Sequence, residues 1–277
     1  MLETLTIILT LLIFSLVSIR AYSRVTERLK LVRTLDLISQ LKTLITSLQR
    51  HRGLSAGYLN GNNRVEPLIL ELRQKIYLCM VSLDRDRVFS RQSRWLSFMD
   101  HWPRLEKNCF GLTGQESFTQ HTNLIENLLR LLEVAAQEWK RSHNLPREII
   151  DLQCIWKELP MAVEFIGQAR AIGMAVAVSG NITKLERNKI KFLEQKIQEY
   201  SLTSFSRLAG RSNEESKELI ISARNACKVF TETLKHELIL PSDVHLNSDS
   251  YFTLASSTME SMNNLLDNEI KRIKAYT

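Results

Sequence analysis

The sequence contains few of the residues that usually interrupt regular structure. Only nine of its 277 residues are glycine and five are proline, whereas these two types make up roughly 12% of an average protein. A β-sandwich or barrel needs turn residues at short, regular intervals, and no stretch of the sequence alternates between polar and apolar residues for long enough to build a sheet. The composition therefore disfavours a β fold and favours long helices.

The sequence also lacks the patterns of metal sites, disulfide frameworks and common enzymes. Its four cysteines include no Cys-x-x-Cys pair, and its six histidines do not stand at metal-ligand spacing. A glycine-rich phosphate loop, a His-Glu-x-x-His helix and a Gly-x-Ser-x-Gly elbow are all missing. We therefore expect no metal, no cofactor and no catalytic residue, and an enzyme is the least favoured class of protein.

Positive charge is only moderately in excess. The formal net charge is +7, but no run of five basic residues occurs anywhere. A basic balance suits nucleic acid, an anionic membrane surface or an anionic ligand, and without a basic arm no nucleic-acid partner is expected. Because 44% of the residues are hydrophobic and 24% are charged, the chain has enough apolar surface to fold.

One uncharged hydrophobic run stands at the start of the chain. It covers residues 5–19, somewhat short of the roughly 20 residues that span the hydrocarbon core of a bilayer. It reaches a workable length at Tyr22 if the Arg20 side chain extends to the lipid headgroups. A cleaved signal peptide is the alternative, but it needs a basic start and a small-x-small cleavage site, and here the start carries Glu3. We expect an uncleaved membrane anchor over residues 1–24.

The charges beside the hydrophobic run predict its orientation. No lysine or arginine precedes the run, whereas five basic residues follow it: Arg20, Arg24, Arg28, Lys30 and Arg33. Because positively charged flanks stay on the cytoplasmic side of a membrane, the N-terminus is expected outside and the remainder of the chain in the cytoplasm.

Apolar residues recur at three- and four-residue steps through most of the remaining chain, the spacing of helices that bury one face. The first stripe, over residues 25–60, continues directly from the anchor, so one helix is expected to serve both membrane and domain. Further helices are expected over residues 65–91, 117–141, 161–208, 212–238 and 249–275, with a short helix broken near Pro103 and a capping box at Ser212-x-x-Glu215. We predict an all-α fold: an up-and-down antiparallel bundle of long helices, formed by residues 25–277 and preceded by one N-terminal transmembrane helix.

Two segments differ from ordinary bundle sequence because they place arginine beside glycine and alanine. They cover residues 48–57 and 165–180. A glycine inside a helix costs about 1 kcal/mol relative to alanine, so its use there needs a reason. Five of the nine glycines lie in these segments, and four of them stand close to the arginines: Gly53, Gly57, Gly167 and Gly173. We expect them to allow close packing of two helices or to leave room for a small ligand.

The arginines of these segments are candidates for an anion site. Arg50, Arg52 and Arg170 lie close to the small positions and are expected to point partly inward, where a guanidinium needs a carboxylate or a bound anion. Arginine suits a planar oxyanion because its fork donates paired N–H bonds. Glu164 is near, but it stands six residues from Arg170 and not on the same helix face. The alternative is that these arginines pair with surface glutamates or point outward.

Four segments resemble a known family in content and in order: LQRHRGLSAGYLNGN from residue 48, HTNLIENLL from residue 121, LPMAVEFIGQARAIG from residue 159 and SYFTLASST from residue 250. With these motifs the sequence resembles the nitrate- and nitrite-sensing (NIT) domain of bacterial signalling proteins over about residues 30–275. The resemblance implies an all-helical sensor that binds nitrate or nitrite through arginines.

The resemblance also points to individual residues. The family's Gln-x-x-Arg-Gly stretch corresponds to Arg52, with Arg50 beside it, and its Gly-Gln-x-Arg-x-x-Gly stretch corresponds to Arg170. A third basic position, in the helix after the long one, is assigned to Arg224, which stands among small residues. The family usually has a glutamate before the Arg-Gly pair, where this chain has His51.

Sensors of this family are normally fused to an output such as a kinase, a chemoreceptor tail, a cyclase or an RNA-binding module. With residues 1–24 as anchor and 25–277 as sensor, we expect no output domain in this chain. Together with the hydrophobic run and its flanking charges, the resemblance predicts a single-pass protein of the bacterial inner membrane with its sensor domain in the cytoplasm. We expect it to signal by helix repacking to a separate signalling protein and to form a homodimer. The alternative is a ligand-free helical adapter that recruits a signalling partner to the membrane.

Overall fold

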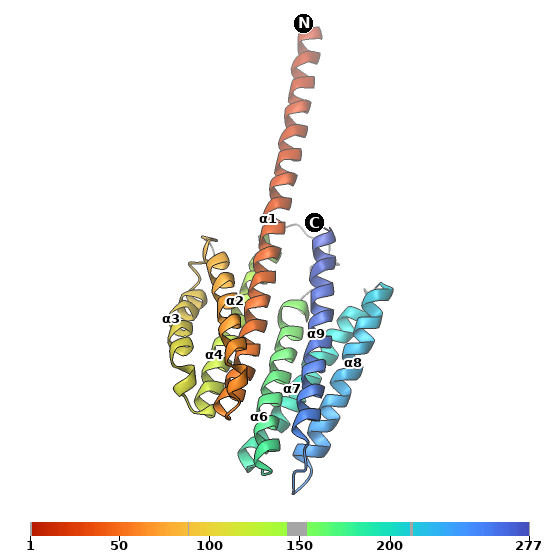
Figure 1. Ribbon diagram of the computed structural model, residues 1–277. Coiled ribbons are helices and arrows are strands. Elements are labelled where there is room, and N and C mark those ends of the chain that lie inside the picture. The colour runs from red at the N-terminus through yellow and green to blue at the C-terminus, as the bar shows by residue number, and fades with distance from the viewer. Residues whose placement is uncertain (1, 88, 143–153, 211–212, 277) are drawn as a thin grey trace.

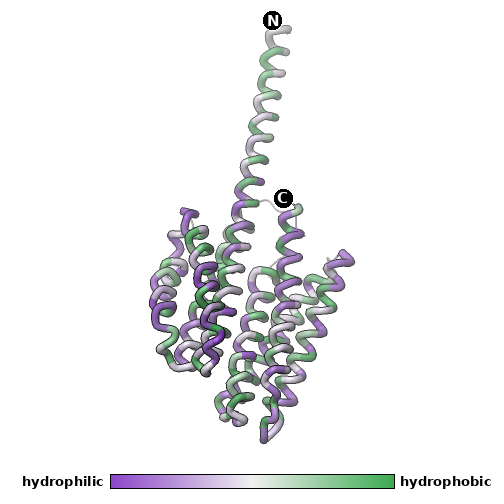
Figure 2. Tube along the Cα trace, in the orientation of Figure 1, coloured by the Kyte–Doolittle hydropathy of each residue, from purple (hydrophilic) through white to green (hydrophobic). Residues whose placement is uncertain are grey.

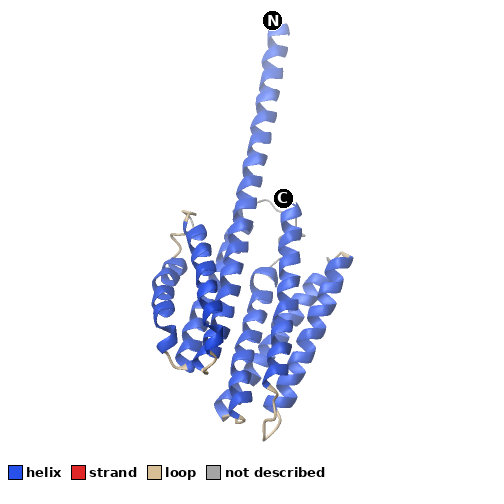
Figure 3. Ribbon diagram, viewed as in Figure 1, coloured by secondary structure: helices blue, strands red, loops and turns tan. Residues whose placement is uncertain are grey.

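The computed structural model describes residues 2–87, 89–142, 154–210 and 213–276 (Figure 1). Figure 3 shows helices joined by short loops, with no strand in these ranges. The α-helices are α1 (Leu2–Leu59), α2 (Glu66–Asp84), α3 (Ser93–Asn108), α4 (Gly114–Ser142), α6 (Leu159–Ser179), α7 (Lys184–Ala209), α8 (Glu214–Thr233) and α9 (Ser248–Tyr276). Short 3-10 or π-helical turns are η1 (Asn63–Val65), η2 (Cys109–Gly111), η3 (Cys154–Glu158) and η4 (Leu234–Ile239). The predicted all-α class is confirmed.

The helices form two bundles that lie side by side. The second half of α1 packs against α2 and α4, and α3 packs on α4; helices α6, α7, α8 and α9 form the second bundle (Figure 1). Successive helices within each bundle run in opposite directions, as predicted. The bundles meet where α1 and α4 contact α6 and where α1 contacts α9. The predicted bundle is therefore a pair of bundles, with α1 and α6 at their common boundary.

Helix α1 continues without a break from the N-terminal hydrophobic run into the first bundle. Its N-terminal part projects far beyond both bundles, and apolar residues predominate along this part (Figure 2). The described apolar side chains there are exposed, Phe14 by 72%, and burial begins at Leu35. By length and composition α1 is able to cross a membrane. Residues 155–179 pass the same test, but more than half of their most apolar window is buried inside the protein, as expected of a core helix.

The C-terminal end of α9 lies beside α1 at the point where α1 leaves the bundles. Lys274 Nζ donates a hydrogen bond to Asp36 Oδ1 at 2.8 Å, and Lys42 Nζ lies 2.7 Å from Asp267 Oδ1. These two ion pairs connect α1, just beyond its projecting apolar part, to α9, the last helix of the second bundle.

The long helix predicted over residues 161–208 is wrong, because two helices occupy this stretch. Helix α6 ends at Ser179, and Gly180 adopts φ 66°, the left-handed conformation that glycine tolerates best at a helix C-terminus. Helix α7 then begins with a capping box, in which Thr183 Oγ1 accepts from the Glu186 backbone N–H and the Glu186 carboxylate accepts from the Thr183 backbone N–H. This glycine and capping box were the overlooked stop and start signals.

The predicted break at Pro103 is also wrong, because the proline lies inside α3. A proline in a helix interior removes one hydrogen bond and costs about 3 kcal/mol. Helix α3 buries four large side chains on one face: Trp95, Phe98, Trp102 and Leu105. Burial of side chains of this size stabilises by roughly 1.5–3 kcal/mol each, which outweighs the lost bond.

The start of α8 is capped by a different residue from the one predicted. Ser212 lies outside the described residues. Asn213 Oδ1 accepts a hydrogen bond from the Ser216 backbone N–H at 3.0 Å, which satisfies one of the free N–H groups of the first turn.

Candidate functional site

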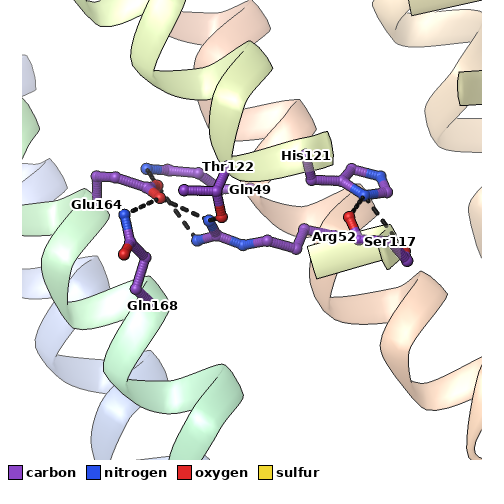
Figure 4. Close-up of polar contacts among 7 residues, drawn as sticks. All are labelled: Gln49, Arg52, Ser117, His121, Thr122, Glu164 and Gln168. Carbon is purple, nitrogen blue, oxygen red and sulfur yellow. Dashed lines mark hydrogen bonds and ion pairs between the residues drawn. The ribbon is translucent and has the colours of Figure 1, made fainter. Parts of the chain in front are cut away.

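A group of buried polar side chains lies where α1, α4 and α6 meet, at the boundary between the bundles (Figure 4). Arg52 of α1 is only 2% exposed. Its Nη1 donates to Glu164 Oε1 of α6 at 2.5 Å and to Thr122 Oγ1 of α4 at 3.0 Å. Its Nη2 donates to Glu164 Oε2 at 3.2 Å. The guanidinium and the carboxylate therefore form a bidentate ion pair, the strongest form of this interaction.

The carboxylate of Glu164 is fully buried and accepts from two further side chains. Gln49 Nε2 of α1 donates to Oε2 at 3.0 Å, and Gln168 Nε2 of α6 donates to Oε1 at 3.0 Å. Each carboxylate oxygen thus receives one N–H from Arg52 and one from an amide (Figure 4). Four N–H groups from three side chains converge on one planar anionic group.

Arg170 lies on α6, as Glu164 does, and its contacts differ from those of Arg52. Nη1 donates to Ser256 Oγ of α9 at 3.0 Å, and the guanidinium lies over the Phe252 ring, 5.3 Å from its centroid. Burial and the positive charge of Arg52 lower the pKa of Arg170 to about 10, so it remains protonated at neutral pH. Within the described residues, its hydrogen bonds and ion pairs include no carboxylate.

Each arginine lies over a glycine of the opposite helix. A Cβ at Gly167 of α6 would lie 2.8 Å from Arg52 Nη2, and a Cβ at Gly53 of α1 would lie 3.3 Å from Arg170 Nη2. The arginine of each helix therefore packs on a glycine of the other helix. A larger side chain at either position would crowd the guanidinium, and this explains why glycine stands inside both helices despite its cost. Gly173 has a related role, because a Cβ there would overlap the Tyr251 ring, whereas a Cβ at Gly57 would have nothing within 4 Å.

A pair of hydrogen-bonded histidines adjoins this group on the side of the first bundle. The Nδ1 of His121 donates to the Ser117 carbonyl at 2.7 Å, which leaves its Nε2 free to accept from His51 Nδ1 at 2.8 Å. Arg73 Nε then donates to His51 Nε2 at 3.4 Å. Burial, reinforced by nearby positive charge, lowers the pKa of both histidines, to about 4 for His121 and further for His51. Both rings are therefore neutral at neutral pH.

The charges of the central group do not cancel. Arg52 and Arg170 contribute two positive charges and Glu164 one negative charge, which leaves an excess of one positive charge. A buried charge without a counter-charge is costly, and the arrangement therefore favours one additional monovalent anion near the two guanidinium groups. Among the described residues no cluster of His, Cys, Asp or Glu is placed to hold a metal ion.

The structure brings together two of the four arginines selected from the sequence. Arg52 and Arg170 face each other across α1 and α6. Arg50 is exposed to solvent, and Arg224 is exposed on α8, with its guanidinium over the ring of Phe205 of α7. These two side chains lie apart from the central group, and their predicted part in binding stays a prediction.

Five polar residues of the group were not selected from the sequence: Gln49, Thr122, Glu164, Gln168 and Ser256. Glu164 was considered only as a partner for Arg170, and its true partner is Arg52 on another helix. A single carboxylate inside the apolar stretch MAVEFIG was the available signal, because such a residue rarely stays buried without a cation.

These features define a class of protein: an all-helical, two-bundle fold with a buried arginine site at the bundle boundary. A family model described as nitrate and nitrite sensing (NIT) matches residues 43–274. The chain therefore belongs to the NIT family, as the sequence motifs predicted. No curated protein matches the chain.

A solved structure described as the NasR transcription antiterminator is similar in fold. Its TM-score is 0.67 at 18% sequence identity, and the superposition covers 95% of this chain and 74% of that chain. At this level of identity the similarity establishes the fold alone, and it agrees with the helical architecture seen here.

Proposed function

We propose that this protein is a membrane-anchored sensor that binds nitrate or nitrite between Arg52 of α1 and Arg170 of α6. The main supporting observation is that the buried Arg52 and the half-buried Arg170 lie close together, whereas the carboxylate beside them, Glu164, is ion-paired with Arg52 and not with Arg170. One monovalent oxyanion restores charge balance there, and family membership names nitrate and nitrite as the ligands to test first.

The signal is a change in the packing of α1 against α6. Arg52 is the link from α1 to the second bundle, and Arg170 links α6 to α9 through Ser256. An anion that bonds to both guanidinium groups draws on donors from both bundles and favours the packing in which they converge. A ligand shifts two packings only by its different affinity for them, and the site meets this condition because its donors lie on separate helices.

The continuous α1 carries this change toward the membrane. Residues 1–24 form the anchor, and by the positive-inside rule the two bundles lie in the cytoplasm of a bacterial cell. Because α9 is ion-paired to α1 near Asp36, a shift of α9 also reaches the membrane-proximal end. The signal passes from there to a separate signalling protein or to a second copy of the chain.

Calorimetric titration tests the proposed ligand. The full-length chain in detergent is titrated with nitrate, nitrite, chloride and sulfate at fixed ionic strength. We expect saturable binding of nitrate or nitrite and at least a tenfold loss of affinity in Arg170→Ala, because a hydrogen bond to a charged group contributes about 1.5–3 kcal/mol. Absence of saturable binding by the wild type would refute the proposal.

The exposed arginines supply matched controls. Arg50→Ala and Arg224→Ala remove the same charge from positions outside the central group, and both variants should bind as the wild type does. Loss of binding in either variant, with Arg170→Ala unaffected, would move the site to that arginine.

One observation favours the second candidate, a ligand-free adapter. Arg52 already has a buried carboxylate partner within the chain, so that part of the site is satisfied without a ligand. If no anion binds, crosslinking of the protein in native membranes should capture a partner protein. If no partner is found either, the adapter is excluded as well.

A further inference from the structure

We propose that Glu164 is a built-in competitor of the anion. Its carboxylate occupies the hydrogen-bond donors that an incoming oxyanion requires, and so it sets the affinity and the selectivity of the site. This inference rests on the proposed function and names the residue that controls it.

The first argument is the arrangement of donors. Arg52 Nη1 and Nη2, Gln49 Nε2 and Gln168 Nε2 converge on the two oxygens of Glu164 at 2.5–3.2 Å. The donors are held from both sides of the boundary between the bundles, since Gln49 and Arg52 belong to α1 and Gln168 belongs to α6.

The second argument is the shape and charge of the bound group. A carboxylate places two oxygens on a planar, trigonal atom and carries one negative charge. Nitrite and nitrate have the same geometry around nitrogen and the same charge. A donor set that fits the Glu164 carboxylate therefore fits these anions, whereas tetrahedral, doubly charged sulfate does not match it.

The third argument is electrostatic. An anion bound to Arg170 while Glu164 stays on Arg52 would bring two negative charges close together in a buried region, where their repulsion is only weakly screened. The favourable state keeps both negative charges near the two arginines, so that the group is neutral, but moves the Glu164 carboxylate off the Arg52 guanidinium, which the anion then occupies. Since Glu164 is part of α6, its withdrawal breaks the ion pair that joins α6 to α1 and connects anion binding to the packing of the two bundles.

The substitution Glu164→Gln tests the competition. Glutamine keeps the size of the side chain but removes the negative charge and one of its two acceptor oxygens, so it releases the Arg52 fork. We expect the affinity of the full-length chain for nitrate and nitrite to rise at least tenfold, with a smaller rise for sulfate. Glu164→Asp, which keeps the charge but shortens the reach toward Arg52, should give a smaller increase and serves as the second variant if Glu164→Gln does not fold.

Glu269→Gln is the matched control. Glu269 is also a buried glutamate in an ion pair, with Arg272 at 2.9 Å. It stands 13 residues beyond Ser256 on α9, about 20 Å along the helix at 1.5 Å per residue. The affinity of this variant should equal that of the wild type.

The outcomes separate this inference from the proposed function. If the wild type binds nitrate or nitrite and Glu164→Gln binds equally or more weakly, Glu164 merely positions Arg52, and competition is refuted while the sensor function stands. If only Glu164→Gln binds, competition is supported and the wild type is not a sensor of the anions tested. If neither binds, both proposals are overturned.

Discussion

Arg52 and Glu164 lie 112 residues apart in the sequence and form the buried ion pair that joins the two bundles. Both side chains are almost completely inaccessible to solvent, at 3% and 0% exposure. The pair joins α1 to α6 at the place where the arginine of each helix packs on a glycine of the other helix. The stability of the protein and the ligand response that we propose therefore depend on the same side chains.

The ion pair predicts a specific pattern of stabilities. Arg52→Met or Glu164→Leu alone leaves one buried charge without its partner, and each should lower the free energy of unfolding by about 3–5 kcal/mol. The double variant replaces the pair by apolar groups of similar volume and should be close to the wild type. Urea unfolding measures all four proteins. A double variant as unstable as the sum of the single variants would show that the losses come from packing and not from the unpaired charge.

The glycines of α1 and α6 predict different responses to alanine. Gly173→Ala forces a methyl group against the buried Tyr251 ring and should cost about 1–3 kcal/mol. Gly57→Ala adds a methyl group in open space and should stabilise the helix by up to about 1 kcal/mol. Thermal unfolding compares the two variants. Equal effects of both substitutions would contradict the close contact at Gly173.

The histidine pair predicts a dependence of stability on pH. The unfolded chain protonates His121 near pH 6.5, whereas the folded protein keeps it neutral to about pH 4. The unfolded state therefore binds more protons in this interval, so the free energy of unfolding falls as the pH falls. Between neutral pH and pH 5 the titration of His121 lowers the free energy of unfolding by about 2 kcal/mol, because each unit of pKa difference corresponds to about 1.36 kcal/mol.

The double variant His51→Gln, His121→Gln checks this effect. Its loss of stability between pH 7 and pH 5 should be smaller than that of the wild type by about 2 kcal/mol or more. The basic groups that face the pair, Arg52, Arg73 and His101, all disfavour its protonation. An identical pH dependence in the variant and the wild type would mean that the rings are protonated in the folded state as readily as in the unfolded one.

The projecting part of α1 predicts membrane attachment. Full-length protein should stay in the membrane fraction after washing at high pH, and deletion of residues 2–22 should release it, because the apolar side chains of this part are exposed in the structure. A reporter joined after residue 277 should be active on the cytoplasmic side. Release of the full-length protein by the wash would contradict the anchor, and an external reporter would reverse its orientation.

Local patterns were sufficient for the helices and insufficient for some of their ends. The spacing of apolar residues predicted α9 to within a few residues and predicted that α1 continues from the hydrophobic run into the bundle. The same spacing did not predict the turn at Gly180, because apolar residues continue at helical intervals from α6 across the turn into α7. It also failed at Pro103, because the burial of the aromatic face of α3 outweighs the local preference of proline.

The sequence by itself determined that the protein is helical, that it begins with an anchor-like segment, that it belongs to its family, and that arginines stand beside glycines in two helices. These properties depend on residues only a few positions apart, so the spacing of residue types along the chain is enough to predict them. The tertiary structure decided that Arg52 and Arg170 meet while Arg50 and Arg224 face solvent. It also decided that Glu164 bonds to Arg52 and that His51 bonds to His121. Such partners depend on where helices distant in the sequence cross and how each is rotated about its axis, and the packing of all the helices together sets both.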